Sequence, residues 1–180
     1  MDPVVARIAE LVPPPAPPRP RDWKAVEAEL GTPLPEDYKQ LVDLYGGGVF
    51  DEVVWLLEPG CPVEDHDLLA VTREREEVLP GLWAIGEPKP AGLTEDGTRL
   101  LPWAYVEDGG QYLYWLAGPG RAPEEWTVTI NEGRGPGWEG HAVSCARFLL
   151  SFMTGEIRSE ILPGPPGQSH VFDANTDILR

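Results

Sequence analysis

The stretch Leu30-Gly31-Thr32-Pro33-Leu34-Pro35-Glu36-Asp37-Tyr38-Lys39 joins the end of one predicted helix to the beginning of another. The first helix begins after Asp22, a good N-cap, and its apolar residues recur at helical spacing. It ends at Gly31, a residue type that often ends a helix. After it, a proline and two acidic residues suit a first helical turn, and the second helix runs as far as Gly46. The apolar residues of the two helices are Trp23, Val26, Leu30, Tyr38, Leu41, Val42 and Tyr45. We therefore expect these two helices to share one core.

The ends of the chain differ in composition from its middle. Apolar residues near the N-terminus form one helical stripe, which the polyproline run at 13–20 then ends as a stiff spacer. A second Pro- and Gly-rich segment follows Leu162, and beyond it the apolar pair Val171-Phe172 is either an edge strand or a loose tail. We therefore divide the chain into a helical arm with a Pro-rich linker (1–20), one domain (21–162) and a C-terminal tail (163–180).

Beyond the glycine triplet at 46–48 the pattern changes from helix to mainly strand. Apolar, β-branched and aromatic residues predict strands at 49–50, 53–57, 82–85, 100–106, 111–116 and 126–130, with a helix at 66–79. Glu107-Asp108-Gly109-Gly110 supplies a hairpin turn, and a last helix begins near Ser144 and ends by Gly155. Because strands and helices do not alternate regularly, the order predicts a single α+β domain with a mostly antiparallel or mixed sheet packed against helices.

Length and composition are those of an ordinary folded domain. The chain has 180 residues, of which 42% are hydrophobic, so it can bury a core of useful size. It contains no apolar run of membrane-spanning length and does not begin like a secretory signal, so we expect a cytoplasmic protein. Its two cysteines, Cys61 and Cys145, have no paired spacing, which predicts reduced thiols and no structural metal.

Acidic residues outnumber basic ones along the chain. Thirty Asp and Glu stand against 14 Lys and Arg, which gives a formal net charge of −16. The segment 51–120 alone holds fourteen acidic and four basic residues. Such a field repels nucleic acid and anionic lipid and attracts basic partners. Solubility is a common reason for negative charge, but the clustering also favours an interaction surface.

No pattern in the chain predicts catalysis. A G-x-S-x-G nucleophile elbow is absent. His141 and Cys145 are spaced as a base and a thiol on one helical face, but Cys145 shares its stripe with large apolar residues, which favours a buried and inert thiol. The polar cluster from Glu64 to Asp67 lacks the glycine turn and the last acidic ligand of a calcium loop. We therefore predict no catalytic residue, no metal and no cofactor.

Several blocks together resemble a known family. Trp23-x-x-Val26-Glu27-x-x-Leu30-Gly31-x-x-Leu34-Pro35-x-Asp37-Tyr38-Lys39, followed by Tyr45-Gly46-Gly47-Gly48, resembles the opening signature of the SUKH superfamily. Leu101-Pro102-Trp103-Ala104, Tyr112-x-Tyr114-Trp115 and Pro123-x-x-Trp126-Thr127-Val128 resemble its middle, and the helix from Phe148 to Gly155 resembles its end. That superfamily includes the yeast cell-wall-assembly regulator, the bacterial Syd protein and many toxin-immunity proteins. The resemblance implies an α+β domain that binds proteins and, in bacteria, often neutralises a secreted toxin, frequently a nuclease.

Charge and resemblance together suggest a non-catalytic immunity protein whose acidic surface blocks the basic cleft of a toxin. The residues that we assign to this surface are Asp51, Glu52, Glu64, Asp65, Asp67, Glu74, Glu76 and Glu77. The expected partner is a basic toxin domain and neither nucleic acid nor a membrane, and the oligomeric state stays open. One alternative is an intracellular scaffold or regulatory protein that recruits partners through the domain and the Pro-rich arm. Another is an enzyme that uses a pair of carboxylates.

Overall fold

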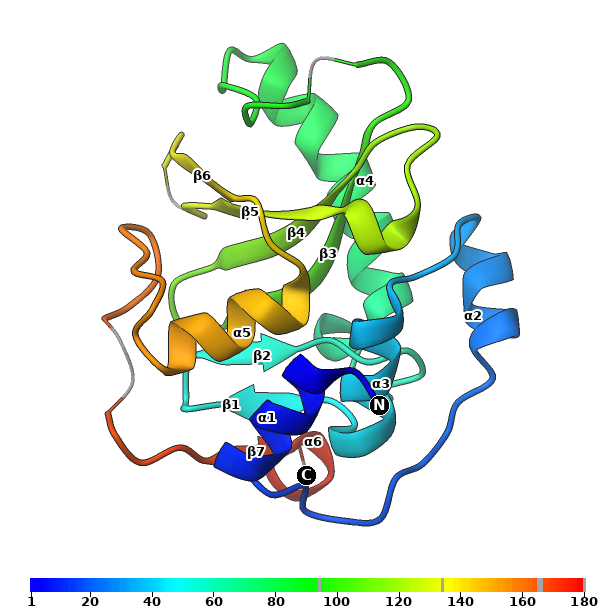
Figure 1. Ribbon diagram of the computed structural model, residues 1–180. Coiled ribbons are helices and arrows are strands. Elements are labelled where there is room, and N and C mark those ends of the chain that lie inside the picture. The colour runs from blue at the N-terminus through cyan, green and yellow to red at the C-terminus, as the bar shows by residue number, and fades with distance from the viewer. Residues whose placement is uncertain (94, 134, 165–166, 180) are drawn as a thin grey trace.

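A seven-stranded antiparallel sheet forms the middle layer of the molecule (Figure 1). The structure is a computed structural model that describes residues 1–93, 95–133, 135–164 and 167–179. Its strands lie in the order β6-β5-β4-β3-β2-β1-β7. They are β1 (Gly48–Phe50), β2 (Val54–Leu56), β3 (Arg99–Val106), β4 (Gln111–Ala117), β5 (Thr127–Asn131), β6 (Trp138–His141) and β7 (Phe172–Ala174).

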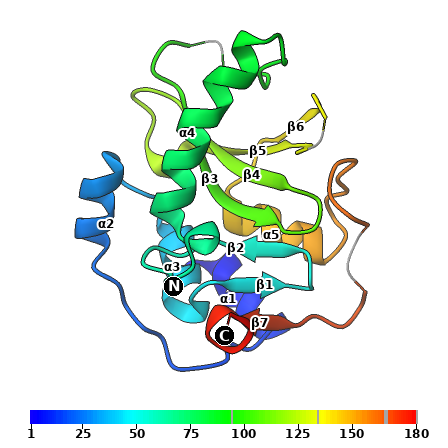
Figure 2. The same ribbon diagram turned by 180° about the vertical axis from the view of Figure 1, so that it is seen from behind.

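Helices cover both faces of this sheet. Helices α1 (Pro3–Leu11), α3 (Glu36–Tyr45) and α5 (Cys145–Met153) lie on the face toward the viewer in Figure 1. Helix α4 (Leu68–Ala84) crosses the opposite face, which Figure 2 presents. The remaining elements are α2 (Trp23–Leu30), η1 (Glu64–His66), η2 (Pro123–Glu125) and α6 (Asn175–Ile178). The arrangement confirms the predicted α+β class.

The main core lies between the sheet and the helices α1, α3 and α5. Trp103 and Trp115 are completely buried there, and Tyr38 of α3 meets Trp115 edge-on with 4.8 Å between ring centroids. The β3–β4 ladder shifts register between Pro102 and Ala104, and Trp103 packs edge-on against Phe148 of α5. Large aromatic side chains bury the most apolar area per residue, so these contacts contribute much of the stability of the fold.

Asp37 and Tyr38, in the first turn of α3, connect this helix to two other elements. The carboxylate of Asp37 is buried and accepts hydrogen bonds from Ala146 N in the first turn of α5 (3.2 Å) and from Cys145 Sγ (3.5 Å). The Tyr38 hydroxyl donates to the carbonyl of Leu57, which follows β2 (2.6 Å). A carboxylate suits the positive end of a helix, so Asp37 acts as a second cap for α5 beside Ser144.

Both chain ends join the same architecture. Val5 and Ile8 of α1 are completely buried, and the hydroxyl of Tyr45 donates to the carbonyl of Val12 just after the helix (2.6 Å). At the other end, β7 pairs with β1, with Val49 opposite Asp173. Of the two alternatives for the apolar pair at 171–172, the structure therefore has the edge strand, although the strand begins at Phe172.

The predicted strand at 82–85 is wrong, because α4 continues through Pro80 to Ala84 and carries Trp83. The proline and glycine at 80–81 had indicated a break. The helix continues because Leu79 and Trp83 pack on Leu100 and Tyr114, and this burial outweighs the local preference. Neither β6 nor α6 was predicted from the sequence, and the helix expected to begin at His66 begins at Leu68, because His66 lies in η1.

Replacing Tyr38 by Phe tests the link between α3 and the strand β2. The substitution removes only the hydroxyl and leaves the buried carbonyl of Leu57 without this donor, so we expect the free energy of unfolding to fall by about 1–2 kcal/mol. Chemical denaturation measures the change. Tyr112→Phe is the matched control, because within the described residues its hydroxyl makes no hydrogen bond. Equal losses in the two variants would contradict a specific role for the Tyr38 hydroxyl.

Candidate functional site

Two of the eight acidic residues assigned from the sequence support the local structure. Asp51, in the turn between β1 and β2, accepts from Val171 N and from the ring of His170 (both 2.8 Å). Asp67 is the N-cap of α4 and accepts from Ala70 N (2.8 Å) and Gly60 N (2.6 Å). Because their oxygens are already engaged, these two carboxylates hold the chain and are poor candidates for binding a partner.

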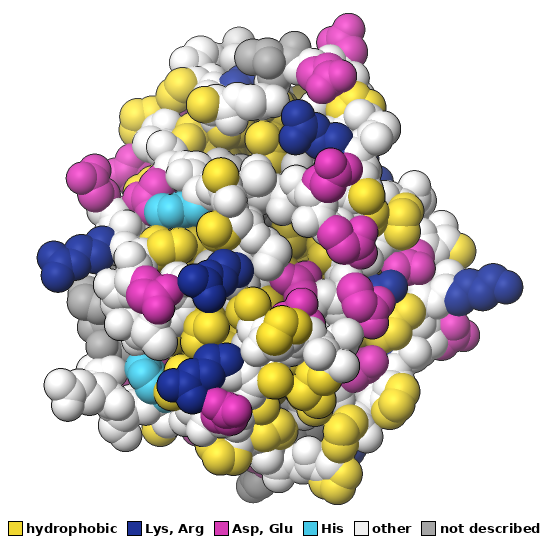
Figure 3. Space-filling view, viewed as in Figure 1, with side chains coloured by type: hydrophobic (Ala, Val, Ile, Leu, Met, Phe, Trp, Pro, Cys, Tyr) yellow, Lys and Arg dark blue, Asp and Glu magenta, His cyan; other side chains and the backbone are white. Residues whose placement is uncertain are grey.

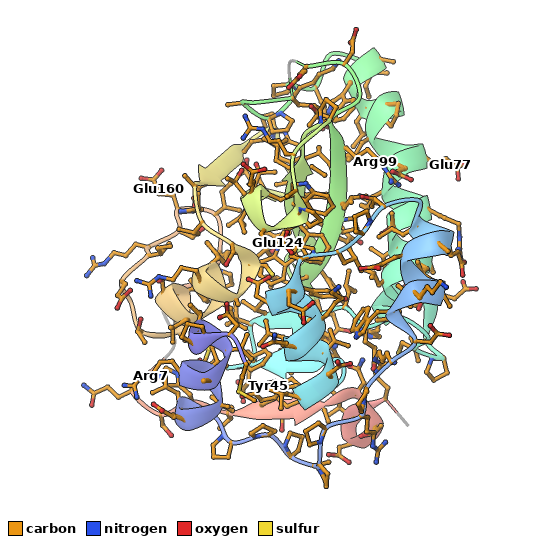
Figure 4. The ribbon with its side chains drawn as sticks, turned by 45° about the vertical axis from the view of Figure 1, so that its right-hand side comes forward. Arg7, Tyr45, Glu77, Arg99, Glu124 and Glu160 are labelled. Carbon is orange, nitrogen blue, oxygen red and sulfur yellow. The ribbon has the colours of Figure 1, made fainter. Side chains whose placement is uncertain are left out.

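The other six lie in three places. Glu52 is in the β1–β2 turn, Glu64 and Asp65 are in η1, and all three are exposed. The remaining three, Glu74, Glu76 and Glu77, are exposed on α4, where Glu74 pairs with Arg75 (2.7 Å) and Glu76 with Arg99 (2.7 Å). Glu77 points outward from α4 (Figure 4). The eight residues therefore do not form one continuous patch.

The structure instead gathers carboxylates around a small cavity of about 190 Å³ beside β1, β2 and β7, which we call the acidic hollow. Its apolar lining consists of Val49, Val53, Trp55, Val106 and Ile178. Its acidic lining consists of Glu52, Glu107, Asp108 and Asp173. The strands β1 and β7 and the helix α6 lie together in the lower part of the molecule in Figure 2, where β7 pairs with the edge of β1. The hollow therefore combines an apolar surface with a concentrated negative charge.

The four carboxylates of the acidic hollow have no structural duty in the described part of the chain, where no hydrogen bond or ion pair engages them. Sequence analysis named only Glu52 among them. Glu107 and Asp108 were counted in the acidic segment but assigned to a hairpin turn, and Asp173 lay in the tail. The pairing of β7 with β1 brings Asp173 to this site, and such long-range pairing leaves no local signal.

Glu52 occupies an unfavourable backbone conformation. Val53 N donates to Phe50 O (3.0 Å) and closes a turn in which Asp51 and Glu52 have φ angles of 51° and 60°. Tight hairpin turns with positive φ at both central positions favour Asn and Gly, and other residues cost free energy there. The contacts of Asp51 with His170 and Val171 offset its cost. Within the described residues, no comparable contact offsets the free-energy cost of the positive φ angle of Glu52.

A buried aromatic cluster supports the hollow from the side of η1. The indole of Trp55 packs against the tilted ring of His66, with 4.4 Å between ring centroids, and donates to Asn175 Oδ1 of α6 (2.8 Å). The hydroxyl of Tyr105 bonds to His66 Nδ1 (2.9 Å). Burial lowers the pKa of His66, opposed by the negative charges of Glu107, Asp65 and Glu58, so its neutral ring is favoured.

The other candidate groups are already satisfied or buried. Burial raises the pKa of the Cys145 thiol well above its ordinary value, and the nearby Asp37 carboxylate adds to the rise, so the nucleophilic thiolate is strongly disfavoured. A larger cavity of about 300 Å³ beside α3 contains Arg21, but its guanidinium is paired with Glu58 and bonded to Pro59 O. Among the residues described, no group of three potential ligands is arranged to hold a metal.

Glu52→Gly tests the strain in the β1–β2 turn. Glycine adopts positive φ without a steric penalty, so we expect the free energy of unfolding to rise by about 0.5–1 kcal/mol. Denaturant titration at neutral pH measures it. Val53→Gly is the control, since Val53 is not among the positive-φ residues and should lose stability. A destabilised Glu52→Gly variant would mean that the side chain has a structural role.

The substitution His66→Gln tests whether the lowered pKa of His66 makes the fold less stable at acidic pH. Because the pKa of His66 is lowered in the folded protein, the unfolded chain takes up a proton first as the pH falls through about 6.5, and acid therefore destabilises the fold. Glutamine can still bond to Tyr105 but does not titrate. We expect the loss of unfolding free energy between neutral and mildly acidic pH to be smaller in His66→Gln than in the unmodified protein. An equal loss would show that His66 does not contribute.

A comparison with protein families bears on this fold and site. Residues 17–137 match the SMI1 / KNR4 family (SUKH-1), and the match covers more than half of the chain. It includes α2, α3 and the sheet from β1 to β5, whereas α1, α5, β7 and α6 lie outside it. Comparison with curated proteins and with solved structures returned no significant match. The matched region confirms the resemblance derived from the sequence, and the chain belongs to the SMI1 / KNR4 (SUKH-1) family.

Proposed function

We propose that this protein is a non-catalytic immunity protein that binds and neutralises a basic protein toxin through its acidic surface. The observation that carries the proposal is the acidic hollow, where four acidic and five apolar residues line one cavity and none of the four carboxylates has a hydrogen-bond or ion-pair partner within the described residues. Membership of the SUKH-1 family is consistent with either a toxin-immunity or a regulatory role. The charge distribution favours the former, because it suits a target that is itself rich in Lys and Arg.

The proposed mechanism is electrostatic capture followed by burial. A net charge of −16 attracts a basic protein over several ångströms, and such attraction raises association rates by about 10–10³-fold at low salt. A nuclease must attract phosphate groups, so the rim of its active site suits this field. We assign the binding role to Glu52, Glu64 and Asp65 of the original eight, together with Glu107, Asp108 and Asp173. Asp51 and Asp67 are omitted because their carboxylates hold the local structure, Glu74 and Glu76 because they pair with arginines, and Glu77 because it lies apart on α4.

The charges on the face that carries α1, α3 and α5 support the choice of the acidic hollow as the binding site. In Figure 3, which looks onto α1, α3 and α5, acidic side chains are mixed with Lys, Arg and apolar groups. Arg7 and Glu10 pair there, as do Arg147 and Glu156. Paired charges cancel at a distance, so this side attracts a basic partner less than the acidic hollow does. No helix in the described part of the chain has the length and apolar character of a membrane span.

The regulatory alternative keeps one supporting observation. Residues 15–20 of the Pro-rich segment are exposed, as a docking motif for an aromatic groove must be. The segment is nevertheless held at both ends, since Tyr45 donates to Val12 O and Arg19 N donates to Asp43 O (2.8 Å). Removing residues 1–20 would also remove buried Val5 and Ile8. The two roles are therefore better separated by Pro18→Ala/Pro20→Ala, which should leave toxin neutralisation intact and abolish recruitment through the arm.

In the decisive experiment, the partner protein is isolated from native extract by its binding to this protein and is then purified. The association rate of the two purified proteins is measured over a range of salt concentrations. We expect a basic partner whose toxic activity is inhibited, and an association rate that falls by about tenfold or more as salt rises. The variant Glu52→Gln/Glu64→Gln/Asp65→Asn should reduce the low-salt rate by about tenfold. The control Glu10→Gln/Glu124→Gln/Glu160→Gln has the same change in net charge, and all three of its residues are exposed outside the acidic hollow; Glu124 and Glu160 are labelled in Figure 4.

Three results would contradict the proposal: an acidic or neutral partner, an association rate that does not depend on salt, or equal rates in the two triple variants. The last result would mean that total charge, and not the acidic face, determines binding. Inhibition of the toxic activity must accompany binding, because a partner that is bound and not inhibited would favour the regulatory role.

A further inference from the structure

We propose that the acidic hollow is a receptor for one arginine side chain of the protein partner. The inference rests on the proposed function for its partner class, a basic protein, and adds the residue that is recognised and the place where it binds. It depends on three properties of the hollow: its size, the nature of its lining and the contribution of the C-terminal segment.

The size of the hollow suits a single side chain. At about 190 Å³ it is smaller than the cavities of roughly 300–1,000 Å³ that bind cofactors and drug-sized ligands. It opens at the surface between the β1–β2 turn, the β3–β4 turn and α6, so a side chain from another protein reaches it without displacing any element. A side chain of a docked protein therefore fits better than a free metabolite.

The lining suits a long cationic side chain. Val49, Trp55 and Ile178 line the hollow and offer an apolar surface for methylene groups, and Ile178 is exposed, so this surface is accessible to a partner. The carboxylates of Glu52, Glu107, Asp108 and Asp173 provide the negative charge. No Lys, Arg or His lines the hollow within the described residues, so nothing there neutralises this charge.

Arginine fits this lining better than lysine. A guanidinium carries five N–H donors in a plane and can bond to several carboxylates at once, whereas an ammonium acts as a compact point charge. The guanidinium is also less strongly hydrated, so less free energy is lost when it leaves water for a site with an apolar surface. The acidic residues that line the hollow come from three separate segments, at 52, 107–108 and 173, so more than one carboxylate is available to a single guanidinium.

The C-terminal segment completes the hollow. Asp173 lies on β7 and Ile178 on α6, and both lie outside residues 17–137, which match the family. Asn175 of α6 holds the segment in place, because it accepts from Trp55 Nε1 and donates to Glu58 Oε1 (2.9 Å). The part of the chain that matches the family supplies one side of the hollow, and the C-terminal segment supplies the rest. We therefore assign part of the hollow's specificity for its ligand to the C-terminal segment.

A nuclear magnetic resonance titration of the full chain tests the inference with a defined probe. The probe is the blocked peptide Gly-Gly-Arg-Gly-Gly, and the lysine and citrulline versions of the same peptide are its controls. The Trp55 indole N–H is the reporter, because it borders the hollow and bonds to Asn175. We expect saturable shifts of this signal and of the Glu52 and Asp173 amides, with a dissociation constant on the order of millimolar for arginine. The lysine peptide should bind several-fold more weakly, and the citrulline peptide should cause no shift.

Two isosteric variants locate the site. Glu52→Gln/Asp173→Asn should weaken arginine-peptide binding by about tenfold. Glu124→Gln/Glu160→Gln, with the same loss of charge elsewhere on the surface, should leave it unchanged. Overlapping amide spectra of the variants confirm that both remain folded. Equal binding of the lysine and arginine peptides, non-saturable shifts, or equal effects of the two variants would overturn the inference.

The outcomes separate this inference from the proposed function. If the arginine peptide binds saturably at the hollow but the native partner is not a toxin, the immunity role is refuted and the arginine receptor is supported. Neutralisation of a basic toxin that is unaffected by Glu52→Gln/Asp173→Asn would keep the immunity role and refute the receptor.

Discussion

The buried carboxylate of Asp37 holds together two helices that lie more than one hundred residues apart in the sequence. It accepts the amide of Ala146 at the start of α5 from its place in the first turn of α3. A buried charge is stable only where donors surround it, so its position determines how α5 sits against α3. The neighbouring residue, Tyr38, bonds to the carbonyl of Leu57 and packs on Trp115. Two consecutive residues thus position one helix on a second helix and on the sheet.

The two ends of the chain extend this framework and lie near each other, since Pro15 and Arg19 line one cavity together with Ala174 and Thr176. The N-terminal helix α1 lies against α3 and α5 and adds Val5 and Ile8 to the core, so it belongs to the folded structure. The C-terminal β7 and α6 add a seventh strand and close the acidic hollow. The segment of the chain that matches the family lies between these additions. The family's domain is therefore combined in this chain with further segments at both ends that complete the fold.

Acidic residues occupy two different environments in the molecule. Asp37, Asp51 and Asp67 use their oxygens to cap helices or hold turns, and each has defined donors. The carboxylates of the acidic hollow have none within the described residues, and Glu52 also carries an unrelieved backbone cost. Strain that the fold does not require is a reason to expect function at that position. The distinction depends on hydrogen-bond partners and not on charge, which is why a count of acidic residues could not draw it.

The sequence by itself determined the class of the fold, the two helices around Gly31 and the hairpin of β3 and β4, because helix caps, turn residues and apolar periodicity act over a few neighbouring residues. It predicted a charged protein-binding surface, but it could not show that Asp51 and Asp67 of that surface also accept hydrogen bonds that hold the local structure. Only the tertiary structure decided that α4 continues through Pro80 and that Asp173 lies beside Glu52. Both depend on contacts between distant segments: the packing of Leu79 and Trp83 on the sheet, and the pairing of β7 with β1. Such contacts gain their free energy only once the chain has folded, and they therefore leave no local pattern.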